Sequence, residues 1–366
     1  MTQIKIASFN LENLFTRPVA MNQDTDAAGA AAIEDHALAN TIINKEVYTD
    51  SDKQTLIELS GKYKWHTLNP PKNALVQLQK IRGSLFRKPK NGPLEVVAKG
   101  RDSWVGWFDL LTEDVSWKAT YNTGRVIDAV RPDILITVEV EDRPTLGRFN
   151  EQILKAHFGF SYKYFMSIDG NDMRGIDLGI MSQYPIVEIR SHVDLPTNGG
   201  FVFSRDCPEY DIILPENKRI VIIPNHLKSK RNGDDTESRA RRKLQADSAH
   251  AIALSALNRS DLVLIGGDLN DTPDSEPLQG LFNDGFTDVS SHPDYPADRP
   301  GTYNTGLAGN KIDYLIMSPA LAGKLQTTGI ERRGSYHPNT WEPFDTVTKK
   351  SEEASDHHLI WGTFEV

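Results

Sequence analysis

One stretch of the sequence joins a buried-strand pattern to several groups that could take part in catalysis. Residues 262–265 form a continuous apolar run, which Gly266 and Gly267 follow. The polar groups that come next are Asp268, Asn270, Asp271 and Asp274. A continuous apolar run is typical of a strand covered on both faces, and two glycines let the backbone turn sharply beside other groups. The stretch therefore predicts carboxylates mounted just beyond a buried strand, where active sites often lie, although a solvated turn would show the same local pattern.

Similar polar groups stand at the ends of other predicted strands, which favours an active site over a solvated turn. They are Asn10 and Glu12 in the first strand, Glu139 after residues 134–138, His226 and Lys228 after residues 219–224, Asp313 within residues 312–317, and Asp356 and His357 before residues 359–364. A carboxylate inside a strand, such as Asp313, needs a partner if it is buried. A solvated turn does not readily explain such groups after so many strands.

The elements that would position these groups alternate between strands and helices. Strands are predicted at 4–15, 134–138, 158–165, 178–182, 186–193, 210–214, 219–224, 262–266, 302–303, 312–317 and 359–364, and helices at 24–48, 75–86, 124–130 and 237–257. The helix at 75–86 rests on Leu75, Leu78, Ile81 and Leu85, which recur at three- and four-residue spacing. Many strands mixed with helices predict a layered α/β protein.

The composition is that of an ordinary globular protein of 366 residues, long enough for one large domain with an insertion or for two domains. The single cysteine, Cys207, excludes an intrachain disulfide. The net charge of −9 argues against a protein that coats nucleic acid non-specifically. The sequence shows no apolar run long enough to span a membrane and no signal-peptide pattern after Met1, so we expect a cytoplasmic location. Nothing in the sequence indicates an obligate protein partner.

Residues 18–118 differ in character from the rest of the chain. Between Lys72 and Arg101 there are eight lysines or arginines and one acidic residue, Glu95. Four of the six tryptophans, at positions 65, 104, 107 and 117, also fall in this region. Basic and aromatic residues together could form a nucleic-acid surface, whereas a mainly helical insertion with its own tryptophan core would have the same composition. We favour the second interpretation, in which the tryptophans form the core of a helical insertion.

Taken in order, six segments resemble the endonuclease/exonuclease/phosphatase family, which includes DNase I, apurinic endonucleases and neutral sphingomyelinases. The segments are residues 8–13 (SFNLEN), 132–139 (PDILITVE), 225–228 (NHLK), 267–270 (GDLN), 312–314 (IDY) and 355–357 (SDH). The resemblance covers about residues 1–17 and 119–366. It implies a single catalytic domain over 1–366, interrupted by the insertion at about 18–118. It also implies the four-layer α/β/β/α sandwich of the DNase I type, with the site at one edge of the sandwich. Because the insertion begins just after Asn13 and ends just before the segment of Glu139, we expect it to lie near that edge and to shape substrate access.

The resemblance implies phosphoester hydrolysis with a divalent metal, either Mg²⁺ or, as a substitute, Mn²⁺. Glu139 would be the principal metal ligand and Glu12 an auxiliary one, while Asp356 would support the metal site. Oxygen ligands of this kind suit Mg²⁺. Asn10 would hold a phosphate oxygen or a metal-bound water.

The same resemblance implies roles for the remaining groups. Asp268 would orient or deprotonate the attacking water, Asn270 would position the phosphate, and His357, paired with Asp313, would stabilise charge on the phosphoryl oxygens. His226 would protonate the leaving oxygen or stabilise the phosphate, with Asp177 as the carboxylate that orients it. Arg174 and Lys228 are candidate phosphate contacts.

Three functions remain in competition. The leading prediction is a nuclease that acts on DNA or RNA, with endo- or exonucleolytic cleavage both open. A lipid phosphodiesterase or a phosphoinositide phosphatase is the alternative, which an exposed aromatic hairpin at residues 104–108 would favour. A binding module with an inactive site would require lost catalytic groups. Here Glu139, Asp268, Asn270, Asp313 and His357 are all present.

Overall fold

The computed structural model describes residues 2–14, 19–21, 26–67, 71, 74–112, 116–172, 175–230 and 235–366. The chain divides into two compact units. The larger unit consists of Met1–Phe15 and Val115–Val366, and the smaller one of Thr16–Asp114.

The larger unit is built on two six-stranded mixed sheets. In the first sheet the strand order is β17 (Leu325–Glu331), β18 (Leu359–Glu365), β1 (Gln3–Leu14), β6 (Ile134–Val140), β8 (Asp177–Ser182) and β7 (Tyr164–Ile168). In the second it is β15 (Thr287–Asp288), β16 (Asp313–Met317), β14 (Val263–Asp268), β13 (Arg219–His226), β12 (Glu209–Ile213) and β9 (Ile186–Arg190). A small hairpin, β10 (Pro196–Thr197) and β11 (Gly200–Phe201), lies outside both sheets.

The two sheets pack face to face because alternate residues of each central strand are apolar. Ile220 and Ile222 of β13 join the core between the sheets, whereas Val221 and Ile223 point to the opposite face. From the first sheet, Ile136 and Ile180 enter the same central core. Both faces of the central strands are therefore buried, as the continuous apolar runs predict.

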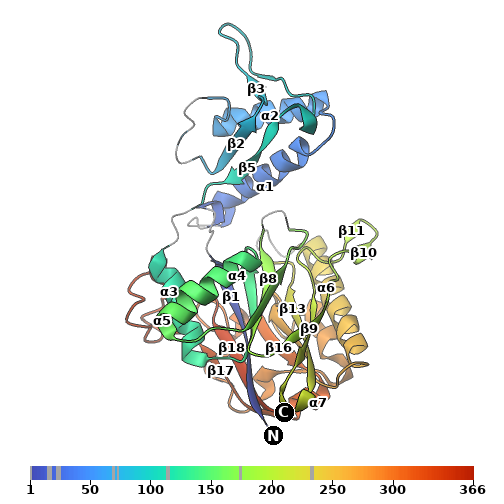
Figure 1. Cartoon of the computed structure of the whole chain (residues 1–366), viewed down its shortest axis with the longest axis vertical. Helices are drawn as coiled ribbons and strands as arrows, with labels where there is room; N and C mark the ends of the chain where they lie inside the picture. The colour runs from blue at the N-terminus through green and yellow to red at the C-terminus, as the bar shows by residue number, and fades with distance from the viewer. Residues whose placement is uncertain are drawn as a thin grey trace. The chain divides into compact units, whose positions relative to one another are not determined.

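Helices cover the outer faces of both sheets (Figure 1). On the first sheet, residues of α3 (Trp117–Val130) and α4 (Arg143–Phe149) share a core with β1 and β6, and α5 (Ala156–Phe158) follows them in the chain. On the second sheet the cover is α6 (Thr236–Ala256), while the short α7 (Pro319–Ala322) follows β16. The result is the predicted four-layer α/β/β/α sandwich, so the fold class is confirmed.

Local sequence sets where these covering helices begin and end. Asp235 caps the start of α6 by accepting a hydrogen bond from the Ser238 backbone N–H at 2.7 Å. Asp142 caps α4 in the same way. Helix α3 ends at Val130, because Arg131 adopts a left-handed conformation and Pro132 cannot continue a helix.

The smaller unit combines two helices with two small antiparallel pairs. Helices α1 (Asp26–Ile43) and α2 (Asp50–Tyr63) precede the pair β2 (Val76–Arg82) and β5 (Val105–Leu110) and the pair β3 (Phe86–Arg87) and β4 (Glu95–Val96). Trp65, Trp104 and Phe108 are buried in a core of its own, as the structural interpretation of the tryptophans predicts. The fourth tryptophan, Trp117, belongs to α3 of the larger unit and is exposed.

Three predicted elements differ from the structure. The helix predicted at 75–86 is wrong: these residues form β2, a turn at Gly83 and the start of β3. Gly83 has φ +76°, which breaks any helix there, and Ile81 of the supposed apolar stripe is 67% exposed. The strand predicted at 158–165 begins only at Tyr164, since α5 extends to Phe158. Residues 302–303 form a single bridge, between Tyr303 and His357, and no strand.

None of the helices in the described ranges combines the length and the apolar character that crossing a lipid bilayer requires.

Candidate active site

Strand pairing brings the predicted polar groups to one edge of the larger unit. Strands β13 and β14 are parallel, so that His226 lies opposite Asp268 at their ends. Strands β14 and β16 are antiparallel, so that Asp268 also lies opposite Asp313 at the start of β16. His357 lies two residues before β18 of the other sheet. Asp268 therefore has functional groups on both sides and from both sheets.

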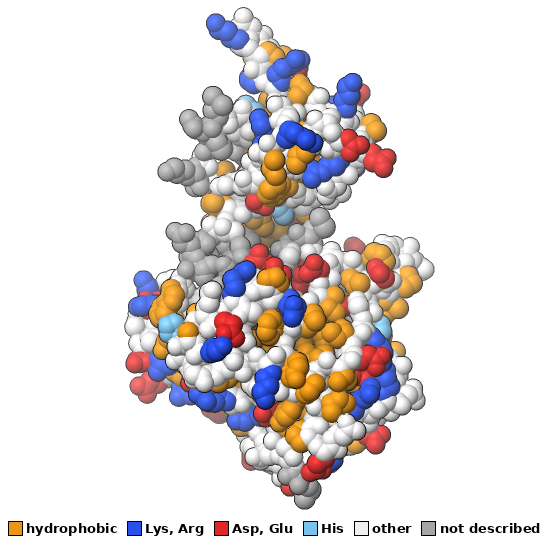
Figure 2. All heavy atoms as spheres, in the orientation of Figure 1, with side chains coloured by type: hydrophobic (Ala, Val, Ile, Leu, Met, Phe, Trp, Pro, Cys, Tyr) orange, Lys and Arg blue, Asp and Glu red, His pale blue; other side chains and the backbone are white. Residues whose placement is uncertain are grey.

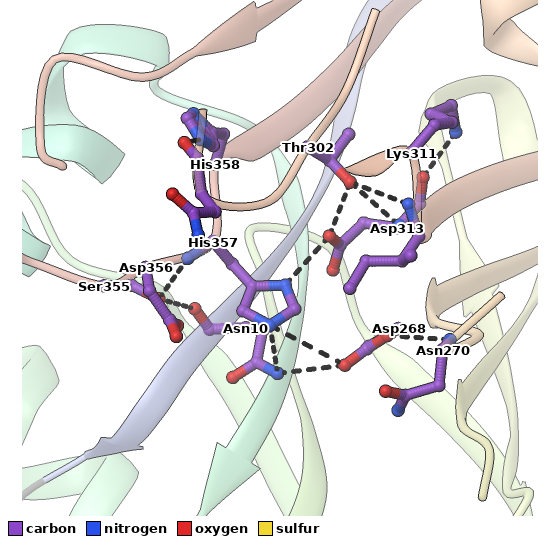
Figure 3. Close-up of polar contacts among 12 residues, drawn as sticks. Asn10, Asp268, Asn270, Thr302, Lys311, Asp313, Ser355, Asp356, His357 and His358 are labelled. Carbon is purple, nitrogen blue, oxygen red and sulfur yellow. Dashed lines mark hydrogen bonds and ion pairs between the residues drawn. The ribbon is translucent and has the colours of Figure 1, made fainter. Parts of the chain in front are cut away.

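A buried histidine–aspartate pair forms the centre of this site (Figure 3). The Nδ1 atom of His357 lies 2.9 Å from Oδ2 of Asp313, which also accepts a hydrogen bond from the Thr302 hydroxyl at 2.7 Å. The Ser355 hydroxyl accepts a hydrogen bond from the His357 backbone N–H at 3.0 Å and donates one to the Asn10 carbonyl at 2.8 Å. These contacts fix both the ring and the backbone of His357.

The opposite ring nitrogen of His357 faces a second carboxylate. Its Nε2 atom lies 3.8 Å from Oδ2 of Asp268 and 3.4 Å from Nδ2 of Asn10. The Asn10 amide also donates to Oδ2 of Asp268 at 3.3 Å. On its other side, Oδ2 of Asp268 lies 3.7 Å from Nε2 of His226. One carboxylate oxygen is thus shared by three nitrogen-bearing side chains.

Asn270 supports this carboxylate from the loop after β14. Its backbone N–H donates to Oδ1 of Asp268 at 2.9 Å, and its side-chain amide donates to the Leu227 carbonyl at 3.1 Å. The loop turns at Asn270 with φ +55°. Just before it, Gly267 has φ +131°, and a Cβ atom there would lie 2.0 Å from the Asn225 carbonyl oxygen. The glycine is therefore required for the close approach of β13 and β14 at the site.

Glu12 and Glu139, with φ +50° and +62°, share the positive φ of Asn270. Residues other than glycine rarely adopt this conformation. Such strain persists only where the surrounding structure imposes it, and it often accompanies function. Both predicted metal-ligand glutamates and the phosphate-positioning asparagine thus stand on strained backbone.

Burial and the neighbouring charges set the protonation of the central groups. Burial raises the pKa of Asp268 to about 7, although the nearby His357 opposes this shift. Burial disfavours a charged His357 ring, but the carboxylates of Asp313 and Asp268 outweigh it and raise the pKa of His357 well above its usual value. The two acidic neighbours therefore favour the protonated form of His357, while burial makes Asp268 easier to protonate than an exposed aspartate.

The acidic donors at this edge fit a hard divalent cation. Oε1 of Glu139 lies 3.9 Å from Nε2 of His226, and Oε2 of Glu12 accepts a hydrogen bond from the Asp356 backbone N–H at 3.1 Å. Glu139, Glu12 and Asp356 offer carboxylate oxygens, which are the ligands that Mg²⁺ and Mn²⁺ prefer. Asp268, Asp313 and His357 also lie close enough to form a metal group. Because Asp313 already accepts hydrogen bonds from Thr302 and His357, we interpret this second group as a hydrogen-bonded relay.

For three of the predicted residues the described contacts do not test the predicted role. Oδ1 of Asp177 accepts a hydrogen bond from the Gly170 backbone N–H at 2.8 Å, so its predicted pairing with His226 stays a prediction. The Lys228 backbone is held by Gln245 and Arg242, whereas the role of its side chain as a phosphate contact also stays a prediction. Arg174 lies outside the described residues. His358, the neighbour of His357, is fully buried, and its Nε2 atom lies 3.0 Å from the Asn304 carbonyl oxygen, so this ring packs in the interior.

Sequence reasoning missed Thr302 and Ser355 as supports of the site. Thr302 reaches Asp313 from eleven residues away, and Ser355 connects His357 to Asn10 across 345 residues. Ser355 belongs to the segment 355–357, but the family resemblance implies roles only for Asp356 and His357. No local pattern marks Thr302, because a single threonine in a loop is common.

Asp177 provides a test that separates stability from catalysis. Burial raises its folded pKa from 3.8 to about 7. Between these values the folded state holds the extra proton, so stability falls as the pH rises through this window and stays lower above it. We expect Asp177→Asn to raise the free energy of unfolding by on the order of 2 kcal/mol at about pH 8 and to change it little at about pH 4. Urea unfolding at both pH values measures the effect.

The exposed Asp194 supplies the control, since Asp194→Asn should leave stability unchanged at both pH values. Destabilisation of Asp177→Asn at high pH would contradict the expected cost of burying this carboxylate. The same variant tests the predicted orienting role, because loss of turnover with gained stability would indicate that the carboxylate serves His226.

Comparison with known proteins agrees with this fold. A model described as the Endonuclease/Exonuclease/phosphatase family matches residues 119–357. A solved protein of that family from Bacteroides thetaiotaomicron has a TM-score of 0.53 at 13% identity, covering 100% of this chain and 99% of that one. A truncated TDP2 from Caenorhabditis elegans has a TM-score of 0.48 at 18% identity, covering 68% of this chain and 90% of its own. No curated protein matches the sequence. At 13% identity the Bacteroides match is evidence for the fold alone.

Proposed function

The chain belongs to the endonuclease/exonuclease/phosphatase family, and from that premise we propose that it is a metal-dependent phosphodiesterase that cleaves nucleic acid. The observation that carries this proposal is the convergence of the His357–Asp313 pair with Asp268 and Asn10 at one edge of the sandwich. Phosphoester hydrolysis needs a base for water and positive groups around phosphorus. This edge supplies both.

In the proposed reaction, Asp268 accepts a proton from the attacking water as the new oxygen–phosphorus bond forms. The protonated His357, held by Asp313, donates a hydrogen bond to a phosphoryl oxygen on which negative charge develops. Asn10 and Asn270 position the phosphate. His226 gives a proton to the leaving oxygen as the ester bond breaks.

A divalent cation held by Glu139, Glu12 and Asp356 would stabilise the charge that develops on the phosphate oxygens. We expect EDTA to abolish hydrolysis, and Mg²⁺ or Mn²⁺ to restore it, whereas Ca²⁺ should restore little because it prefers more ligands and a looser geometry. The measurement is turnover after chelation and metal addition, with the unfolding temperature as a control for loss of structure. Full turnover in EDTA would contradict the proposal.

The aromatic segment 104–108 weighs against the lipid alternative. Trp104 and Phe108 are buried at 2% and 1% exposure, and only Trp107, at 41%, is open to solvent. Insertion of this segment into a membrane surface would need its apolar side chains to be exposed, and two of its three aromatic residues are buried. The proposal of an inactive module requires missing catalytic groups, and these groups are present and close together.

The deciding experiment is hydrolysis of plasmid DNA, RNA, sphingomyelin and bis-p-nitrophenyl phosphate in parallel, with Mg²⁺ and with EDTA. Cleavage of DNA or RNA that EDTA blocks is the expected result. Cleavage of sphingomyelin without either polynucleotide would overturn the nuclease proposal and support the lipid alternative.

A further inference from the structure

The cations of the smaller unit are divided between paired and unpaired positions. In its helical half, Lys45 pairs with Asp52 and Lys62 pairs with Asp35. Residues 74–112 contain seven lysines or arginines and three acidic residues. Within the described residues, six of these cations form no ion pair. Arg101 donates a hydrogen bond to the Gly106 carbonyl, and the other five are Lys80, Arg82, Lys88, Lys90 and Lys99. All five are exposed.

One face of the sheet formed by β2 and β5 is open to solvent. Helix α1 packs on its other face, where Val76 and Phe108 join the core. On the open face Trp107 lies opposite Gln79, and its ring nitrogen donates to Asp109 at 2.8 Å. This hydrogen bond fixes one edge of the indole while 41% of the side chain stays exposed. An exposed, oriented tryptophan on a sheet is a platform on which a base can stack.

We propose that residues 74–112 bind single-stranded nucleic acid through a surface in which the exposed, unpaired cations Arg82, Lys88 and Lys90 contact phosphates and Trp107 stacks on a base. Figure 2 shows lysine and arginine side chains around the end of this unit that carries β3. The cations complement the phosphates, and the indole takes a base that a duplex would keep within its stack. The inference rests on the proposed nuclease function for its choice of ligand class. The sugar is left to the test, since DNA and RNA share this backbone charge and these ring faces.

Charge complementarity is the stronger of the two arguments. The whole chain has a net charge of −9, so a polyanion is repelled by most of the protein. The unpaired cations of residues 74–112 are therefore where a polyanion would gain the most electrostatic binding energy. In the helical half, Asp52 and Asp35 already neutralise Lys45 and Lys62. A polyanion would therefore gain much less binding energy from these two lysines.

The test of the cations uses the full chain in EDTA, with fluorescein-labelled oligothymidylate, oligouridylate and a DNA duplex as probes. We expect both single strands to bind more tightly than the duplex. Lys88→Gln with Lys90→Gln should weaken single-strand binding about tenfold and reduce the slope of log affinity against log salt by about 1.4. Lys45→Gln with Lys62→Gln removes the same charge from the helical half and should leave both quantities unchanged.

The test of stacking compares two substitutions at Trp107. Trp107→Ala should weaken single-strand binding about tenfold without changing the salt slope, and Trp107→Phe should retain most of the affinity. Duplex binding should not respond to either change. An equal response of duplex and single strand would overturn the stacking argument.

Hydrolysis of bis-p-nitrophenyl phosphate separates this inference from the proposed function. All of these variants should hydrolyse this small diester at the wild-type rate, because none alters the candidate active site. Single-strand binding by a chain that hydrolyses no phosphodiester would leave the surface standing and overturn the nuclease proposal. Unchanged binding by the Lys88 and Lys90 variant, or no binding by the wild type, would overturn the inference.

Discussion

Asp268→Asn is expected to lower turnover by about two to four orders of magnitude, the range for loss of a general base. Asparagine has the same shape, so Asn10, His226 and His357 should keep their places around it. An amide cannot take a proton from water, and its NH₂ group would face the Asn10 amide, which now donates to the Asp268 carboxylate at 3.3 Å. The chemical step is thereby lost while the fold is kept.

Single-turnover hydrolysis of bis-p-nitrophenyl phosphate at saturating Mg²⁺ measures this effect, with circular dichroism to confirm folding. Asp274→Asn is the matched control, because Asp274 lies in the same loop but is exposed. It should retain wild-type turnover. Near-normal turnover of Asp268→Asn would exclude Asp268 as the general base. The proposed mechanism would then have no base at the end of β14.

The groups at strand ends could be predicted because a local pattern marks them. Asp268 and His226 each follow a continuous apolar run, and such a run can be identified as a buried strand without knowing its partners. The parallel pairing of β13 and β14 then places both residues at one edge. Glu139 was identified in the same way. Much of the site could therefore be identified from the position of each residue at the end of a predicted strand.

The supports of the site depend on contacts that no local pattern encodes. Thr302 acts on Asp313 because a loop returns beside β16, and the positive φ of Glu12 and Glu139 follows from packing around them. The error at residues 75–86 has a similar cause. Leu75, Leu78 and Leu85 fit a helical period. The segment nevertheless forms a strand, because it pairs with β5 and because the chain turns at Gly83.

His357→Gln is expected to lower turnover by about two to four orders of magnitude, and Asp313→Asn by a smaller factor in the same direction. Glutamine can donate a hydrogen bond but cannot carry the positive charge that the proposed transition state requires. Asp313→Asn keeps the ring but removes the carboxylate that raises its pKa. The measurement is turnover across the pH range. His358→Gln, at the neighbouring buried histidine, should keep most of its turnover.

The His357–Asp313 pair should also make the free energy of unfolding depend on pH. The pKa of His357 is raised in the fold above the value of 6.5 that applies to the unfolded chain. The stabilisation is therefore complete below pH 6.5 and is lost as the pH rises through the folded pKa. Urea unfolding of the wild type should show the free energy of unfolding falling as the pH rises. In Asp313→Asn this fall should be smaller.

The double variant decides whether the two residues act as one unit. If Asp313 works only by holding a charged His357, the activation free-energy cost of changing both should equal that of changing His357 alone. Additive costs would mean that Asp313 acts on the reaction by another route, such as metal binding. The short Nδ1–Oδ2 contact of 2.9 Å and the Thr302 bond to the same oxygen leave Asp313 little freedom for a second role, so we expect the non-additive result.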